Sequence, residues 1–171
     1  MPLKIKIKNI ENGVHYFDFN ESPKSLGLNK PFSNYIKVNC KMDKSQNQFV
    51  LNCDLKVHTN FECDRCSEEF EAELERDFKL FYFFDEENID DEDSNTFYIA
   101  PEEDYIDISK EVREYAMLSV PMKIVCDDDC KGLCAGCGVD LNKEECRCSK
   151  DEVRPEWEEL LKLKDKINKQ G

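Results

Sequence analysis

Histidine, glycine and long apolar runs are scarce in this 171-residue chain, and each scarcity argues against a class of protein. The two histidines, His15 and His58, have no nucleophile at a recognisable spacing, so a histidine-based catalytic centre is not expected. The six glycines do not form a phosphate-binding loop. No stretch reaches the roughly 18 consecutive apolar residues of a membrane helix. We therefore expect a protein that is neither an enzyme nor membrane-bound.

The amino-terminal segment MPLKIKIKNI also lacks the continuous apolar core of a signal peptide, because lysine occupies every second position from Lys4 to Lys8. This pattern predicts a cytoplasmic protein. The chain nevertheless contains ten cysteines. In a reducing compartment, clustered thiols are more often metal ligands than crosslinks, so metal binding is the first hypothesis and disulfide formation the second.

The net charge of −14 is unevenly distributed along the chain. Residues 1–60 hold nine lysines and five acidic residues, a net +4, so the remainder carries −18. An acidic surface repels a phosphate backbone, which disfavours broad nonspecific RNA binding. Direct contact with RNA would have to use the lysine-bearing first third, whereas the acidic remainder could meet a basic protein or serve solubility alone.

Alternation of apolar and polar residues, which is typical of strands with one buried face, occurs in several segments. These segments are 3–7, 17–19, 36–42, 49–57 and 70–84. The segments 36–42 and 49–57 are separated by the polar turn DKSQNQ, which predicts a hairpin. The sequence therefore predicts an antiparallel sheet over roughly the first half of the chain.

Helical spacing appears only after this region. Ten of the twenty residues 85–104 are acidic, which predicts a mobile acidic loop. A helix is then expected from Ile108 to Ser119, ended by Pro121, and a last helix is expected from Pro155. The predicted fold class is α+β: an antiparallel sheet that could close into a barrel, then a helix, a cysteine-rich zinc knuckle and a C-terminal helix.

This organisation predicts two units. A β-rich domain with the acidic loop and the packing helix should span residues 1–120, and the knuckle with the terminal helix should span 121–171.

Six cysteines gathered near the C-terminus are the strongest chemical signal: Cys126, Cys130, Cys134, Cys137, Cys146 and Cys148. Zinc favours a tetrahedron of thiolates, and a CxxC followed by glycine forms a turn whose amides can point at the sulfurs. Cys134 and Cys137 fit that turn, and Cys146 with Cys148 would supply a second pair. Cys126 and Cys130 then form an alternative or additional pair. A metal-free or oxidised loop is the competing interpretation.

A further CxxC, Cys63 and Cys66, precedes the longest predicted strand. It could join Cys134 and Cys137 in a ribbon-like site, and eight clustered cysteines would then make two four-thiolate sites. A redox role would require an accessible thiolate, usually at a helix start in a βαβ unit, and no such unit is predicted. The remaining two, Cys40 and Cys53, are expected to lie in the hairpin core, where their side chains act as small buried hydrophobic groups.

The order of these features resembles the YceD family of bacterial and plastid large ribosomal RNA subunit accumulation proteins. The resemblance rests on CDRC entering a long strand, on IDISKEVREYAMLSVPMK, and most specifically on LSVPMK followed by CKGLCAGCGVDLN. The family commonly has Leu where this chain has Ser67, and Pro within the second CxxC where this chain has Ala135 and Gly136. Neither departure removes a potential ligand.

The resemblance implies a non-catalytic factor for large ribosomal subunit biogenesis that supports accumulation or processing of large-subunit ribosomal RNA. It also implies that this RNA or its precursor is a partner, contacted directly or through ribosomal or assembly proteins. Arg65 in CDRC is a candidate for RNA contact, with an ion pair to a neighbouring glutamate as the simpler role. The alternatives are a thiol redox-sensing protein and a ribosomal RNA processing nuclease.

Overall fold

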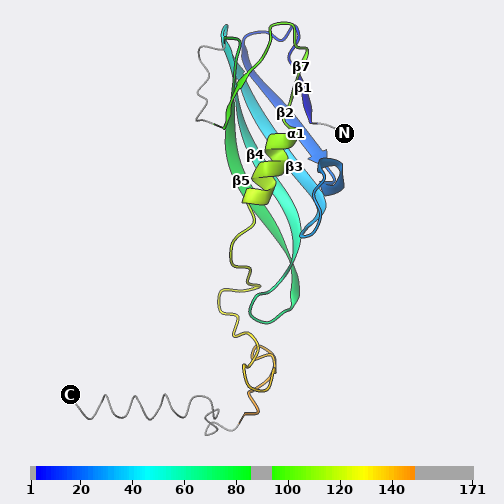
Figure 1. Cartoon of the computed structure of the whole chain (residues 1–171), viewed down its shortest axis with the longest axis vertical. Coiled ribbons are helices and arrows are strands. Elements are labelled where there is room, and N and C mark those ends of the chain that lie inside the picture. The colour runs from blue at the N-terminus through cyan, green and yellow to red at the C-terminus, as the bar shows by residue number, and fades with distance from the viewer. Residues whose placement is uncertain (1–2, 86–93, 149–171) are drawn as a thin grey trace, which may run out of the picture.

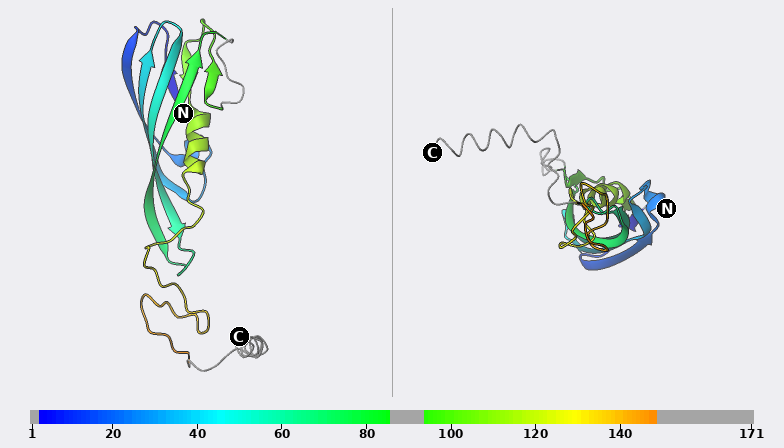
Figure 2. Two further views of the ribbon diagram at one scale, coloured as in Figure 1. Left: turned by 90° about the vertical axis from the view of Figure 1, so that its left-hand side faces the viewer. Right: turned by 90° about the horizontal axis from the view of Figure 1, so that it is seen from below.

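The computed structural model describes residues 3–85 and 94–148 and shows an elongated molecule (Figure 1). A twisted sheet forms one end, and the cysteine-rich segment lies beyond the tip of that sheet. Figure 2 shows the same arrangement from the side, with the helix α1 (Ser109–Leu118) lying along one face of the sheet. The predicted C-terminal helix from Pro155 lies outside the described residues.

The main sheet has five strands in the order β2-β3-β4-β5-β6. They are β2 (Gly13–Glu21), β3 (Phe32–Lys44), β4 (Gln48–Glu62), β5 (Glu69–Phe83) and β6 (Thr96–Tyr98). The first four are antiparallel neighbours, which confirms the predicted hairpin and the long strand after it. A short 3-10 helix, η1 (Pro23–Leu26), follows β2. The β3, β4 and β5 strands have 13, 15 and 15 residues, and their length explains the elongated shape.

Two expectations about the strands were wrong. The segment 85–104 is not wholly a loop, because β6 lies within it and pairs in parallel with β5; its most acidic part, residues 86–93, lies outside the described residues. The first strand, β1 (Lys4–Lys6), does not join the main sheet but pairs with β7 (Tyr105–Asp107) in a separate two-stranded sheet. Across the described residues, β2 and β6 remain edge strands that do not meet, so the sheet does not close into a barrel.

The core lies on one face of the main sheet. Side chains that alternate along β3 and β4 are buried on this face, and the helix α1 (Ser109–Leu118) packs over them with Val112 and Ala116. The Tyr115 ring stacks on Phe78 of β5 at a centroid distance of 4.4 Å. This confirms the predicted helix and its apolar face. Within the described parts of the chain, no helix is long and apolar enough to cross a membrane.

Cys40 and Cys53 occupy this core but are not free thiols. They are directly opposed partners in the β3–β4 register, and the structure joins them in a disulfide. Both residues are buried, as expected from their position in the hairpin. The expectation of unbonded side chains was wrong because it considered the face of each strand separately and not the cross-strand register, which places the two Cβ atoms side by side.

After α1 the chain runs to the end of the β4–β5 hairpin and forms the knuckle, defined here as residues 119–148. Its regular structure is limited to turns and one isolated bridge between Leu133 and Asp140. Only Cys130 and Gly132 of this segment are buried. A segment that buries so little apolar surface needs another source of stability.

Candidate metal centres

The eight cysteines outside the core form two groups of four, and within each group all Sγ atoms lie within 4.8 Å of one another. The first cluster contains Cys63, Cys66, Cys126 and Cys130. The second cluster contains Cys134, Cys137, Cys146 and Cys148. All eight are free thiols in the structure.

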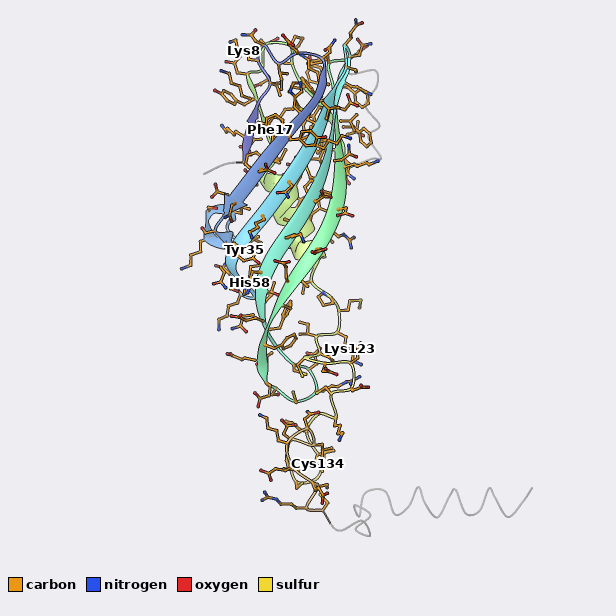
Figure 3. The ribbon with its side chains drawn as sticks, turned by 180° about the vertical axis from the view of Figure 1, so that it is seen from behind. Lys8, Phe17, Tyr35, His58, Lys123 and Cys134 are labelled. Carbon is orange, nitrogen blue, oxygen red and sulfur yellow. A yellow bond between two sulfur atoms is a disulfide. The ribbon has the colours of Figure 1, made fainter. Side chains whose placement is uncertain are left out.

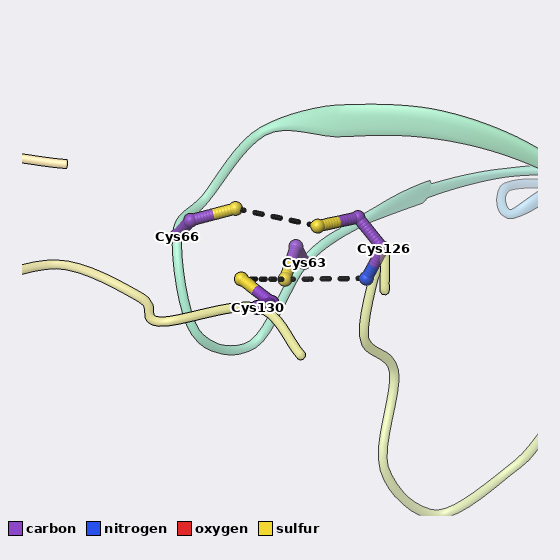
Figure 4. A group of neighbouring side chains, drawn as sticks. All are labelled: Cys63, Cys66, Cys126 and Cys130. Atoms are coloured by element: carbon purple, nitrogen blue, oxygen red, sulfur yellow. Dashed lines mark hydrogen bonds between the residues drawn. The ribbon is translucent and has the colours of Figure 1, made fainter. Parts of the chain in front are cut away.

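The first cluster joins the sheet to the knuckle. Cys63 and Cys66 lie on the turn between β4 and β5, while Cys126 and Cys130 approach from the segment after α1 (Figure 4). The Sγ atoms of Cys66 and Cys126 are 3.7 Å apart, and those of Cys63 and Cys130 are 3.9 Å apart. Three of the four side chains are buried. Together with Phe70 and Val125 they form a small core separate from the main one.

Backbone hydrogen bonds position this turn against the knuckle. The Asp64 amide donates to the Ile124 carbonyl at 2.8 Å, and the Ile124 amide donates to the Asp64 carboxylate at 2.7 Å. Further along, the Leu133 amide donates to the Arg65 carbonyl at 2.9 Å. These hydrogen bonds hold the knuckle against the β4–β5 turn. They bring the cysteines of the turn within reach of the same ion as cysteines 60 or more positions later in the chain.

Amides also aim at the sulfurs of the first cluster. The backbone N–H groups of Arg65 and Cys126 each lie 3.4 Å from the Cys63 Sγ. Burial raises the pKa of the Cys63 thiol, but the N–H groups of Cys126, Cys66 and Arg65 together outweigh burial and lower it to about 6. Burial and contact with Cys63 raise the pKa of Cys126 to about 12. Four adjacent thiols cannot all ionise unaided, so a bound cation is needed to hold them as thiolates.

Two residues outside the cysteine pattern support the first cluster. Asn142 donates from Nδ2 to the Cys130 Sγ at 3.4 Å, and its Oδ1 accepts from the Lys131 amide at 2.8 Å. The Arg65 guanidinium donates from Nη1 to the carbonyls of Asp128 and Cys130 at 2.9 and 2.8 Å. Sequence reasoning missed Asn142, for which the only signal was its place in the GVDLN turn.

The Arg65 geometry bears on its predicted role. The simpler interpretation was an ion pair with a neighbouring glutamate. The guanidinium instead holds the loop that carries Cys130. The RNA contact itself stays a prediction.

The second cluster is local to the knuckle and more exposed. The Cys134 Sγ lies 3.3 Å from the Cys146 Sγ and 3.7 Å from the Cys148 Sγ. The N–H groups of Cys137 and Gly136 lower the pKa of Cys134 to about 6. The N–H groups of Val139 and Arg147 likewise lower the pKa of Cys137. This is the CxxC turn expected from the sequence, with Cys146 and Cys148 as its second pair.

Both groups fit a tetrahedral metal ion. Metal–sulfur bonds of about 2.3 Å in a regular tetrahedron place the sulfurs about 3.8 Å apart. Two separations in the first cluster, 3.9 and 3.7 Å, match this value, two in the second are 3.3 and 3.7 Å, and all others lie within 4.8 Å. Disulfides would require about 2.05 Å. The ribbon-like pairing was wrong, however, because Cys63 and Cys66 meet Cys126 and Cys130 and not Cys134 and Cys137.

The two histidines belong to neither cluster. His58 lies on the outer face of the sheet, where its Nδ1 is 2.9 Å from the Ser33 hydroxyl (Figure 3). The His15 Nε2 lies 2.9 Å from the Glu11 carbonyl oxygen. The candidate ligand set within the described residues is therefore entirely thiolate, and such sites are usually structural because no coordination position is left open.

A mainly antiparallel sheet with one packing helix and two four-cysteine clusters defines, over the described residues, a mostly β protein with two candidate structural metal sites. Residues 51–164 match the family model described as "Large ribosomal RNA subunit accumulation protein YceD". The chain belongs to the YceD family. No solved structure matches it.

Two curated relatives are plant proteins named "Large ribosomal RNA subunit accumulation protein YCED homolog 1, chloroplastic". The relative from Arabidopsis thaliana is 38% identical over 79 residues, which are 46% of this chain and 24% of the relative. The relative from Zea mays is 39% identical over 70 residues, which are 40% of this chain and 23% of the relative. The alignments thus span about a quarter of each relative's length.

Proposed function

We propose that this protein is a non-catalytic, cytoplasmic factor that supports accumulation of large-subunit ribosomal RNA, and that two structural zinc ions hold its knuckle in place. Family membership supports the link to large-subunit RNA. The observation that carries the non-catalytic role is the all-thiolate composition of both clusters, because a catalytic zinc usually keeps a water on an open position.

The outer face of the sheet offers a surface for RNA. One row across four strands contains Tyr16, Lys41, Asn52 and Lys79, which are consecutive partners in the strand register. Tyr16 is 72% exposed, so its ring is available for stacking on a base, and the two lysines could contact phosphates. This row contains no acidic residue, although the neighbouring row through Asp18, Asn39, Asp54 and Asp77 contains three.

The contact can be tested with a matched pair of changes. In the double variant Lys41→Ala/Lys79→Ala, affinity for a large-subunit RNA fragment should fall and its dependence on salt should weaken, by about one unit of log–log slope per lost phosphate contact. The control is Lys56→Ala, because Lys56 is an exposed lysine of the same face that already pairs with Glu75. Equal RNA binding by all three proteins would exclude this row as the contact.

The cellular role requires a separate experiment. Cells depleted of the protein should show a lower ratio of large to small ribosomal subunits, with a matching loss of large-subunit RNA. Complementation with Cys66→Ser or Cys137→Ser should restore the ratio only partly if the knuckle contributes. An unchanged ratio on depletion would refute the proposal.

The same strains and the purified protein address the two alternatives. A redox sensor should change its effect on subunit ratio reversibly on mild oxidation, whereas thiolates in tight zinc sites are protected from oxidation. A processing nuclease should cleave precursor RNA when purified and supplied with Mg²⁺. Cleavage by the purified protein would overturn the non-catalytic proposal.

A further inference from the structure

A hollow at the end of the molecule opposite the clusters has three tyrosines and two carboxylates in its wall. It has a volume of about 380 Å³ and is lined by Tyr82, Tyr98, Tyr105, Glu103 and Asp107, with Ile99, Ala100 and Ile106 completing the wall. β5, β6, β7 and the connection between β6 and β7 supply these residues. Figures 1 and 3 show that this end, near β7 and Lys8, lies far from Cys134 in the knuckle.

The three tyrosines differ in burial, which gives the hollow a fixed base and accessible walls. Tyr82 is 6% exposed and its ring stacks on Phe97 at a centroid distance of 5.1 Å. Tyr98 and Tyr105 are 44% and 48% exposed, so much of each side chain faces solvent. Three aromatic side chains lining one hollow are the composition of a cage that attracts a cation through the negative faces of its rings.

The local charge has the sign that such a cage requires. Burial, and after it the negative charges of Glu111 and Asp107, raise the pKa of Tyr82. Glu111 is only 9% exposed, and its Oε2 has no hydrogen-bond partner among the described residues. A buried carboxylate without full pairing is costly, and a cation nearby would offset part of that cost.

Basic residues close to the hollow do not occupy it. In the β1–β7 register Lys6 is the partner of Tyr105 and Lys4 is the partner of Asp107, but neither lysine lines the hollow. Lys8 is bound by Asp104 at 2.7 Å. No lysine or arginine appears in the wall as far as the chain is described.

We propose that the hollow between Tyr82, Tyr98 and Tyr105 binds the side chain of an arginine or lysine presented by a basic protein partner. The wall of the hollow is complementary in charge to such a partner, since among the described residues it carries Glu103 and Asp107 and no lysine or arginine. The same carboxylates disfavour a phosphate group in the hollow. That the partner is a ribosomal protein rests on the proposed function, whereas the cation-binding property does not.

The test uses the purified full chain and Nα-acetyl-arginine amide, in which only the side chain is charged. Titration should shift the methyl resonances of Ile99 and Ile106 in a saturable manner, and the neutral citrulline analogue should not. Tyr98→Ala and Tyr105→Ala should each weaken binding about two- to fivefold, the equivalent of the 0.5–1 kcal/mol expected for an exposed cation–π contact. Tyr98→Phe keeps the ring and should retain binding.

The control is Tyr35→Ala, which removes a tyrosine that contacts His58 on the outer sheet face and should leave binding unchanged. Equal shifts with arginine amide and citrulline amide, or no loss in Tyr98→Ala and Tyr105→Ala, would overturn the proposal. Shifts of the same methyls by an RNA oligomer would assign the hollow to nucleic acid and overturn it as well. These outcomes are independent of the subunit ratio in depleted cells, so the two proposals fail separately.

Discussion

Removing one ligand from each cluster in turn should produce two different partial structures of the knuckle. The wild-type protein should bind two zinc ions per chain, and Cys66→Ser and Cys137→Ser should each bind one. Loss of the first cluster should release residues 124–133 from the hairpin turn and leave 134–148 folded around its own ion. Loss of the second should disorder 134–148 and leave 124–133 attached, because the two clusters share no ligand.

The expected magnitudes follow from what the knuckle buries. Ordering the 15 residues of 134–148 costs about 15 kcal/mol at roughly 1 kcal/mol per residue. One structural zinc contributes about 10–16 kcal/mol, and the local hydrogen bonds add a few more. Apolar burial contributes little, since Cys130 and Gly132 are the only buried residues of the whole knuckle. One bound ion would therefore be just sufficient to order residues 134–148.

Elemental analysis measures metal per chain, and hydrogen exchange read by mass spectrometry follows the two peptides separately. The double variant Cys40→Ala/Cys53→Ala serves as control, because it removes two cysteines from the core disulfide and should still bind two ions. If both peptides lost protection to the same extent in Cys66→Ser and in Cys137→Ser, the two clusters would not be independent and the reasoning would be refuted.

Three further changes test individual contacts. Asn142→Ala removes the hydrogen bond to the Cys130 sulfur and should weaken metal binding at the first cluster about 10- to 100-fold, as measured by competition with a chelator. Gly132→Ala should destabilise the knuckle by more than about 1 kcal/mol in chelator-dependent unfolding. Its φ is +73°, and the new Cβ would lie 2.8 Å from a backbone oxygen. Glu111→Gln should increase the free energy of unfolding at neutral pH by about 1 kcal/mol, measured as a higher thermal midpoint.

The pH dependence of the last change has a defined sign. Burial raises the pKa of Glu111 above its unfolded value, so the folded state binds more protons in the intervening pH range. Wild-type stability should therefore fall relative to Glu111→Gln as pH rises from about 4.3 through the raised pKa, and the difference between the two proteins should stop changing below about pH 4.3. A constant difference at every pH would contradict this account.

The other two changes have matched controls. Asn52→Ala alters an asparagine on the outer sheet face and should not affect metal affinity. In Gly138→Ala the alanine must also adopt a φ of +73°, but its new Cβ has no neighbour within 4 Å. Gly132→Ala should therefore be the more damaging change, and equal losses would exclude the contact with Arg65 as the cause.

Much of the fold was predictable because the interactions concerned are local in sequence. Alternation along β3, β4 and β5 reflects one buried face, and the spacing of Val112 and Ala116 reflects one helical face, so each pattern can be read without knowledge of the partner element. The turn at Cys134 and Cys137 was predictable for the same reason. Its sulfurs are held by amides of the next few residues, and its second pair follows within 14 positions.

Features that depend on register or on distant contacts were not predictable. The disulfide between Cys40 and Cys53 follows from which residues face each other across β3 and β4. The pairing of Cys63 and Cys66 with Cys126 and Cys130 follows from where the chain arrives after α1. Asn142 acquires a role only when that pairing brings its amide to the Cys130 sulfur.

The sequence by itself thus determined the long strands, the helix α1, the local thiolate turn and the charge asymmetry, since each depends on the order and spacing of neighbouring residues. Only the tertiary structure decided that the sheet stays open, which cysteines share a cluster, and that three tyrosines from separate strands surround one hollow. Contacts of this kind join residues far apart in the chain, and the register and packing of whole elements fix them.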